Sequence, residues 1–509
     1  MLRGEGTGWT SGAGPADETR EDGGREALLR RLAELEARAA PLEPDAADRA
    51  RLREAAVASS ERFLEALGAL KVFDDDAGTG LGLLEAPISE GGTGLEEVMG
   101  LVDREVVLPG AATASGGHLA YIPGGGLYHS ALGDFLAAVS NKYAGLFYTG
   151  PGAVRMENLL LRWVADLVGY PAAAGGNLTS GGSLATLAAV AAARDAHGLR
   201  GRDLASAVVY LSEQTHHCME KALCIAGLGE VQRRLVPLDE GFRMRPEALE
   251  RLLAEDRRRG LRPWLITAAA GTTDTGAVDP LEALANLAER EGCWFHVDAA
   301  YGGFFLLTEL GRSALGGIER SHSVILDPHK GLFLPYGSGI VLVRQEGTLA
   351  APHDQSGAYM QDARDRAGET SPCDVSGELS KHFRALRMWL PLVLLGVRPF
   401  RAALEEKLLL ARYFYREIGA AGFEVGPPPE LSVVTFRWAP AGGGLEETNR
   451  FNRALVEGVR RDGRIFLSST TIDGRFVLRL AALSFRTHRR TVDLAVQILR
   501  EQVEALRAG

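Results

Sequence analysis

The stretch WLITAAAGTTDTGAVDPLEALANLAEREGCWFHVDAA, residues 264–300, decides the fold. Two short apolar runs, Trp264–Ala268 and Trp294–Val297, have the length and composition of buried strands. Between them, Pro280–Glu291 has the spacing of an amphipathic helix. A strand, a helix and a second strand in this order predict a parallel βαβ unit, whose ligands bind beyond the carboxyl ends of the strands.

The same alternation of strands and helices continues on both sides of this unit. We therefore expect a large α/β domain over residues 111–395, built on a mainly parallel sheet. Three more apolar runs are predicted as strands of this sheet: Ala207–Leu211, Ser323–Leu326 and Gly339–Val343.

The two ends of the chain depart from this pattern. Residues 1–25 have few large apolar side chains, so we expect disorder there. Leucines three and four residues apart from Leu28 onward predict an N-terminal helical segment over residues 26–110. Residues 396–509 are expected to form a small α+β domain. Its predicted elements are strands at Leu431–Arg437, Arg464–Ser468 and Phe476–Ala481 and a closing helix at Thr491–Leu506.

Composition narrows the class of protein. Of the 509 residues, 46% are hydrophobic and 24% are charged, as in soluble globular proteins, and the net charge of −10 argues against nucleic acid or an anionic membrane as the main partner. The four cysteines lie far apart, as in reduced proteins. No apolar stretch approaches the roughly 20 residues that span a bilayer, and the N-terminus lacks the apolar core of a signal peptide. We expect a cytoplasmic location.

A lysine directly follows one of the buried strands. In SVILDPHKGLFL, residues 323–334, Lys330 is followed by Gly331, Leu332 and Phe333. Ammonium groups avoid apolar surroundings, and burial is expected to lower the pKa of the Lys330 amine, which suits a nucleophile that attacks a carbonyl. The alternative is a lysine whose stem lies along the strand end while its head reaches water.

A carboxylate ends the second strand of the βαβ unit. Asp298 follows the run WFHV, which places it at the sheet edge where α/β proteins bind ligands. A carboxylate that faces a pyridine nitrogen keeps this nitrogen protonated, and the small residues Ala299 and Ala300 would let a flat ring approach. The alternative is an ordinary helix N-cap aspartate.

A glycine-rich turn precedes an apolar helix. In NLTSGGSLATL, residues 177–187, Gly181 and Gly182 lead into the helix and Ser183 adds a hydroxyl group. Free N–H groups at the start of a helix bind phosphate. A nucleoside triphosphate is not expected, because no GKS or GKT follows the turn. The alternative is a plain capped loop.

Two further strand ends carry polar side chains. In SEQTHHCMEKA, residues 212–222, His216 could stack on a heteroaromatic ring or be a satisfied core histidine. His216 and His217 are adjacent, so they project differently, and no third ligand has a suitable spacing; we expect no metal site. The loop after Trp264–Ala268 adds the hydroxyl group of Thr273 at the same edge.

Taken in order, these segments resemble the group II decarboxylases that depend on pyridoxal 5′-phosphate (PLP), the family of aromatic-amino-acid, glutamate and histidine decarboxylases. The resemblance covers roughly residues 85–505. It implies PLP-dependent transferase fold type I, which is aspartate-aminotransferase-like with a seven-stranded type of large-domain sheet. It also implies that Lys330 forms the Schiff base, Asp298 faces the pyridine nitrogen and His216 stacks on the ring. The cofactor-binding residues implied are Gly182, Ser183, His216, Thr273, Asp298, Ala300, Asp327, His329 and Lys330.

A later segment extends the resemblance. HDQSGAYMQD, residues 353–362, is similar to the family's catalytic loop, whose tyrosine protonates the carbanion left by CO₂, and Tyr359 matches this tyrosine. The alternative for Tyr359 is an ordinary exposed loop tyrosine. Aldehyde-forming relatives tend to have phenylalanine there, so the resemblance implies plain decarboxylation. The family's loop reaches into the neighbouring subunit's site, which implies a homodimer.

One segment departs from the family pattern. Tyr121, Ile122 and Pro123 match the aromatic–aromatic–proline segment of the substrate pocket in aromatic-amino-acid decarboxylases, but Ile122 replaces the second aromatic residue. Gly124 replaces a polar residue, and the glycines at 124–126 would widen the pocket or loosen the loop. An aromatic substrate and an acidic or polar substrate both stay open.

The sequence therefore predicts an enzyme of amino-acid metabolism, a PLP-dependent carboxy-lyase that converts an L-amino acid into its amine and CO₂. The predicted catalytic residues are Lys330, His216, Asp298 and Tyr359. One alternative is another reaction on the same fold, that of an aminotransferase or a carbon–carbon lyase. A further alternative is a PLP-binding protein without catalytic activity. The presence of all four residues opposes both.

Overall fold

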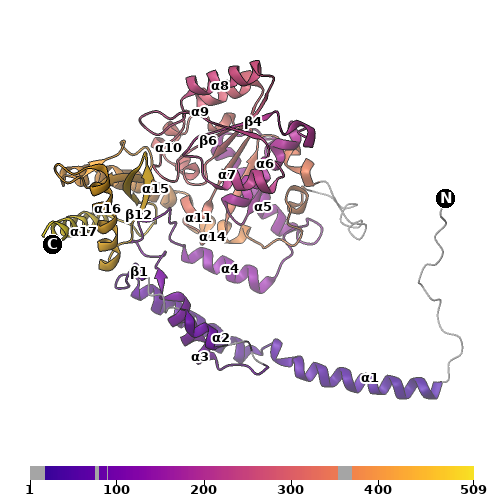
Figure 1. The fold of residues 1–509 in the computed structure, drawn as a ribbon. Coiled ribbons are helices and arrows are strands. Elements are labelled where there is room, and N and C mark those ends of the chain that lie inside the picture. The colour runs from indigo at the N-terminus through magenta and orange to yellow at the C-terminus, as the bar shows by residue number, and fades with distance from the viewer. Residues whose placement is uncertain (1–17, 75–79, 87, 89, 354–368, 509) are drawn as a thin grey trace, which may run out of the picture. The chain divides into compact units, whose positions relative to one another are not determined.

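The computed structural model describes residues 18–74, 80–86, 88, 90–353 and 369–508, with side chains from Gly24 onward. These residues form two compact units (Figure 1). The first unit contains the N-terminal helices, and the second contains both of the larger sheets. Among the described residues, no helix combines the length and the apolar character needed to cross a bilayer.

The N-terminal unit is helical, as expected. Helix α1 (Glu18–Ala39) begins before residue 26, where the helical pattern was expected to start. Between Glu18 and Leu28, glutamates and arginines favour a helix whereas Gly23 and Gly24 oppose it, so the composition of this stretch does not mark where the helix begins. In the same unit follow α2 (Ala46–Ala66), η2 (Leu81–Glu85), α3 (Leu95–Val102) and η3 (Asp103–Val107).

A seven-stranded sheet in the order β3-β9-β8-β7-β6-β4-β5 forms the centre of the second unit. All its strands run parallel except β9, which is antiparallel to both of its neighbours. The prediction of a mainly parallel sheet is therefore confirmed. The strands are β3 (Gly175–Thr179), β4 (Ala207–Leu211), β5 (Gln232–Leu235), β6 (Arg262–Ala269), β7 (Trp294–Asp298), β8 (Ser323–Leu326) and β9 (Gly339–Val343).

Helices cover both faces of this sheet (Figure 1). Tyr210 and Phe295 belong to the core that includes helices α5, α8 and α9, whereas Val209 and Trp294, their chain neighbours, belong to the core that includes α6 and α7. Burial on both faces explains why these strands read as continuous apolar runs. The helices are α5 (Pro151–Val168), α8 (Pro246–Arg258) and α9 (Leu281–Glu291), and α6 (Gly182–Ala196) and α7 (Cys218–Ile225).

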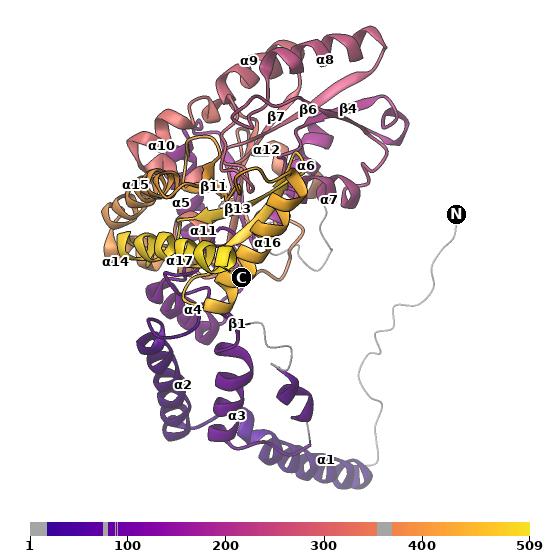
Figure 2. The ribbon, with the colours of Figure 1, turned by 60° about the vertical axis from the view of Figure 1, so that its left-hand side comes forward.

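A four-stranded antiparallel sheet, in the order β10-β11-β13-β12, lies in the C-terminal part of the chain. Helix α16 packs against β13, and α17 lies beside α16 (Figure 2). The α+β prediction is therefore confirmed for this part. Its elements are α15 (Arg398–Ala420), β10 (Glu424–Val425), β11 (Val433–Arg437), α16 (Leu445–Asp462), β12 (Ser468–Ile472), β13 (Arg475–Ala481) and α17 (Arg489–Ala508).

The predicted strand at Arg464–Ser468 is wrong, because the strand begins where the prediction ends. Asp473 and Gly474 both have positive φ, 50° and 75°, which is the backbone of the tightest hairpin turn. Ile472 pairs with Arg475 directly across this turn, so β12 is Ser468–Ile472. The apolar run before it, Ile465–Leu467, is buried without joining the ladder.

His118 is a buried histidine next to the end of this run. It pairs with Phe466 in an isolated bridge and is 1% exposed, and neither ring nitrogen has a hydrogen-bond partner among the described residues. Burial lowers the pKa of His118 from 6.5 to about 4. The unfolded chain therefore binds more protons than the folded chain between these values, so the folded state loses stability as the pH falls from 6.5 towards 4.

We predict that His118→Phe reduces the sensitivity of the fold to acid. The drop in the free energy of unfolding between pH 8 and pH 5 should become smaller by about 2 kcal/mol, because phenylalanine takes up no proton. Urea unfolding at the two pH values measures this difference. An equal drop in the variant and the unaltered chain would mean that His118 does not titrate in this range.

Candidate active site

The ends of five strands of the seven-stranded sheet converge on a cavity of about 410 Å³. Turns after β3, β4, β6 and β8 line it, together with the last residue of β7. This is the edge at which α/β sheets bind ligands. All nine predicted cofactor-binding residues line this cavity: Gly182, Ser183, His216, Thr273, Asp298, Ala300, Asp327, His329 and Lys330.

Lys330 lies in the short helix α11 (Pro328–Gly331), directly after β8. Its Nζ atom is 3.0 Å from Oδ2 of Asp327. Burial on its own lowers the pKa of the Lys330 amine, but the carboxylates of Asp327 and Asp298 outweigh burial and raise this pKa above its usual value. The expectation of a lowered pKa is therefore wrong: the amine is held as a cation between two anions.

Asp298 and His216 also line the cavity. Oδ1 of Asp298 accepts a hydrogen bond of 3.1 Å from the N–H of Ala300, which fixes the carboxylate at the end of β7. Nδ1 of His216 accepts a 3.3 Å hydrogen bond from the N–H of Cys218. Burial lowers the pKa of His216, although Asp298 opposes the shift, so the ring is neutral near pH 7 and suited to stack on a flat ring.

The glycine-rich turn forms a tight cradle between β3 and α6. Oγ1 of Thr179 accepts the N–H of Gly181 at 3.3 Å and donates to the Gly181 carbonyl at 3.0 Å. A Cβ atom at Gly182 would lie 3.0 Å from Oδ2 of Asp327, a tight contact that a side chain could make only if Asp327 shifted. The first N–H groups of α6, at Gly182 and Ser183, have no acceptor within a helix and can donate to phosphate.

These features fit PLP. The start of α6 suits its phosphate, Asp298 suits its pyridine nitrogen, and His216 suits its ring. Lys330 is the amine that can bond to its aldehyde. No group of three or more His, Cys, Asp or Glu side chains in the described part of the chain is placed to hold a metal ion.

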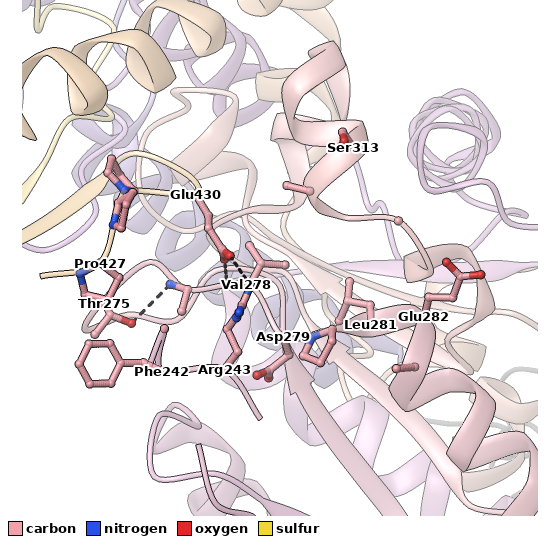
Figure 3. Close-up of a pocket in the computed structure, with 18 of the residues that line it drawn as sticks. Phe242, Arg243, Thr275, Val278, Asp279, Leu281, Glu282, Ser313, Pro427 and Glu430 are labelled. Carbon is pink, nitrogen blue, oxygen red and sulfur yellow. Dashed lines mark hydrogen bonds and ion pairs between the residues drawn. The ribbon is translucent and has the colours of Figure 1, made fainter. Parts of the chain in front are cut away.

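A larger hollow, of about 920 Å³, lies elsewhere in the same unit between the start of α9 and the prolines 427–429 (Figure 3). Two of its charged side chains, Arg243 and Glu430, are already paired: Arg243 lies 2.7 Å from Asp239 and 3.3 Å from Glu430. Glu430 also accepts the N–H of Val278. No lysine is among the described residues that line it, so it cannot hold PLP as a Schiff base.

Comparison with known proteins decides the family. The family model for the pyridoxal-dependent decarboxylase conserved domain matches residues 83–439. The chain belongs to this family. It is 35% identical over 419 residues to aromatic-L-amino-acid decarboxylase of Bacillus atrophaeus, with 82% of this chain and 86% of that protein covered. It is 32% identical over 414 residues to tryptophan decarboxylase 2 of Oryza sativa, with 78% and 83% covered.

A solved structure agrees with these relatives. The crystal structure of Oryza sativa TDC with PLP and tryptamine matches with a TM-score of 0.86 and 26% identity, over 91% of this chain and 99% of that chain. The predictions of fold type I, of PLP and of an amino-acid carboxy-lyase are confirmed. When bound, PLP supplies the electron sink for the bond that breaks at Cα. The residues of the decarboxylase position the reactants and hold protons.

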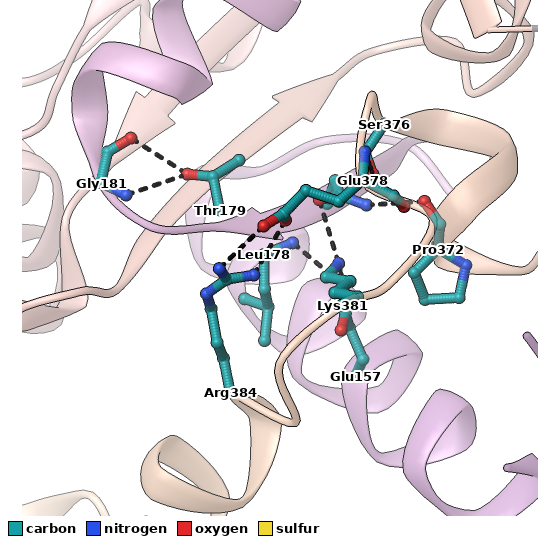
Figure 4. A network of polar contacts seen from close by, with 10 residues as sticks. Glu157, Leu178, Thr179, Gly181, Pro372, Ser376, Glu378, Lys381 and Arg384 are labelled. Carbon is teal, nitrogen blue, oxygen red and sulfur yellow. Dashed lines mark hydrogen bonds and ion pairs between the residues drawn. The ribbon is translucent and has the colours of Figure 1, made fainter. Parts of the chain in front are cut away.

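A buried polar network fixes the strand that leads into the phosphate turn (Figure 4). Lys381 pairs with Glu157 of α5 and donates to Oδ1 of Asn177 at 3.0 Å. Glu157 also accepts the N–H of Leu178 at 3.1 Å. The side chains of Lys381 and Glu157 are both buried, so loss of one partner would leave the other as an uncompensated buried charge. Our sequence analysis missed this network, because nothing in the sequence links residues 157, 177 and 381.

Arg479 of β13 fixes the loop that carries Thr273. Its guanidinium donates to the carbonyl oxygens of Thr273 and Asp274 and, at 2.9 Å, to Oγ of Ser468. The decarboxylase therefore ties its four-stranded sheet to one wall of the cofactor cavity. Sequence analysis missed this residue too, although an arginine inside the apolar run of β13 was a usable signal.

The predicted substrate-pocket residues Tyr121, Ile122 and Pro123 are not among the described residues that line this cavity. Tyr121 is 60% exposed and has a positive φ of 56°, and Ile122 is buried in the main core. Pro123 is buried as well. A side chain at Gly124 would overlap the carbonyl oxygen of His329, so this glycine permits close backbone contact behind the lysine rather than a wider pocket. Tyr359 lies outside the described residues.

We predict that Asp298→Asn lowers kcat by about 1000-fold. Asparagine still accepts the N–H of Ala300, so the variant removes the charge that keeps the pyridine nitrogen protonated and little else. Steady-state CO₂ release and the absorbance of retained PLP measure the effect. Unchanged kcat with full PLP retention would show that Asp298 does not face the ring nitrogen.

Proposed function

We propose that the enzyme decarboxylates an aromatic L-amino acid. The observation that carries this proposal is the charge of the cavity: among the described residues that line it, Lys330 is the only lysine or arginine. An acidic substrate would bring a second carboxylate, and a buried carboxylate without a cation is strongly destabilised. A neutral aromatic side chain needs no such partner.

The relatives support this substrate class. Two of them are named for aromatic-L-amino-acid and tryptophan decarboxylation, and the similar solved structure contains tryptamine. The glycine at position 124 no longer argues against it, since the close approach to His329 accounts for this glycine.

Three side chains of the enzyme have separate roles in this proposal. The ammonium of Lys330, 3.0 Å from Asp327, must lose its proton before it bonds to PLP as a neutral amine. His216, which is neutral, packs its face on the ring. Tyr359 remains the proposed donor of a proton to Cα, by its match to the family's loop.

An assay of the twenty amino acids tests the substrate class. We expect CO₂ and the matching amine from tryptophan, tyrosine or phenylalanine, with kcat/KM at least about 100-fold lower for glutamate and aspartate. A preference for glutamate would overturn the aromatic assignment and leave the reaction intact. A keto acid formed without CO₂ would overturn the reaction itself.

We also propose a cytoplasmic homodimer. All four cysteines are free, which suits a reducing compartment. An exposed apolar face on α4 (Tyr128–Ser140) supports association with a second copy, because its side chains recur at helical spacing and α4 lies beside α14 (Ala385–Leu395), which also exposes apolar side chains. The apolar patch consists of Tyr128, Leu132, Phe135, Leu136 and Val139 on α4 and Val393 and Leu394 on α14.

We predict that Leu136→Glu converts the dimer to monomers at micromolar concentration, because a charge in the centre of the apolar patch would be buried without a partner. Leu409→Glu is the matched control: Leu136 is 50% exposed and Leu409 is 53% exposed, but Leu409 lies on α15, outside the patch. Sedimentation velocity distinguishes the two. Equal sedimentation of both variants as dimers would contradict an interface on α4.

A further inference from the structure

We propose that Asp327 takes up a proton when the phosphate of PLP binds, so that retention of the cofactor depends on pH through this one carboxyl group. The inference rests on the assignment of the cavity to PLP. Asp327 pairs with Lys330 in the cofactor-free enzyme and donates a hydrogen bond to the phosphate once PLP is bound.

The first observation is the state of the Asp327 carboxyl group. Its side chain is 3% exposed, and Oδ2 pairs with Lys330. Oδ1 is buried and has no hydrogen-bond partner among the described residues. A buried oxygen without a partner is costly, so a donor or a proton at Oδ1 would relieve the site.

The second observation is the direction in which this carboxyl group faces. A Cβ atom built on Gly182 would lie 3.0 Å from Oδ2 and 3.4 Å from Oδ1. The carboxylate thus lies against the start of α6, where the N–H groups of Gly182 and Ser183 suit a phosphate. A phosphate bound there would be a close neighbour of Asp327.

The third observation is the charge balance around Asp327. Lys330 supplies one positive charge at 3.0 Å, and Asp298 supplies a second negative charge nearby. Nε2 of His329 is 3.7 Å from Oδ2, but burial lowers the pKa of His329, and the pKa of His216 is lowered in the same way, so both rings are neutral near pH 7. Burial raises the pKa of Cys218 to about 11, so its thiol is neutral as well.

Binding of PLP makes this balance unfavourable. The phosphate carries a charge of about −1.5 to −2, whereas the positive charge of the ring nitrogen is paired with Asp298. Asp327 and the phosphate are then two close anions that share the single positive charge of Lys330. Like charges this close in a site with little water do not both stay ionised, so one proton is bound between them. A protonated Asp327 carboxyl group can donate a hydrogen bond to the phosphate.

The test compares the cofactor-free enzyme with its Asp327→Asn variant. The probe is pyridoxine 5′-phosphate, which has the ring and the phosphate but a neutral hydroxymethyl group in place of the aldehyde, so Lys330 does not react with it and no further cation is added. Titration calorimetry at pH 8 in two buffers of different ionisation enthalpy counts the protons taken up. Protons that belong to the probe are the same for both proteins and cancel in the comparison.

We expect the unaltered enzyme to take up about one proton more than Asp327→Asn, because an amide donates the same hydrogen bond without a proton. Its affinity should also fall about tenfold more steeply per pH unit above pH 8 than that of the variant. With pyridoxine, which has no phosphate, the two proteins should take up equal numbers of protons. Asp327→Ser, which offers a hydroxyl donor, serves if the asparagine variant does not fold.

Equal proton uptake for the phosphorylated probe would overturn the inference and leave the PLP site standing. A difference that persists with pyridoxine would also overturn it, because the proton would then not depend on the phosphate. Failure of the unaltered enzyme to bind the phosphorylated probe at all would instead contradict the PLP site, and CO₂ release would be absent as well.

Discussion

The active site depends on one electrostatic constraint: two carboxylates, that of buried Asp327 and that of partly buried Asp298, share the ammonium group of Lys330. Both carboxylates come from ends of adjacent parallel strands, β7 and β8, so the register of the sheet brings them to the same edge. Without a cation, the buried carboxylate of Asp327 would be strongly destabilised. The pairing therefore stabilises the cavity and also keeps the reactive amine in place.

Much of the fold could be predicted because its strands are buried on both faces. Continuous apolar runs such as Ala207–Leu211 and Ser323–Leu326 match their strands residue for residue. The two strands of this sheet that the prediction missed, β3 and β5, lack that signal. Both are edge strands with one neighbour: β3 has the sequence GGNLT and β5 has the sequence QRRL. Neither composition favours a strand by itself.

The candidate site could be predicted as a set of residues but not as a balance of charges. Each cofactor-binding residue follows a strand or a turn that the sequence marks, and the sheet brings all of them to one cavity. The direction of the pKa shift of Lys330 could not be predicted, because it depends on distances to Asp327 and Asp298 and not on burial alone. The role of Gly124 could not be predicted either, because it depends on contact with the backbone of His329, which is distant in sequence.

Two buried cations outside the cavity hold its walls in different ways. Lys381 is neutralised by Glu157, an ion pair that fixes β3 ahead of the phosphate turn. Arg479 has no carboxylate partner among the described residues and binds two backbone carbonyl oxygens beside Thr273 instead. Burial lowers the pKa of this guanidinium, so carbonyl dipoles must offset the lost hydration. Arg479 can reach the loop at Thr273 only when the four-stranded sheet is folded. The order of the cofactor cavity therefore depends on that sheet.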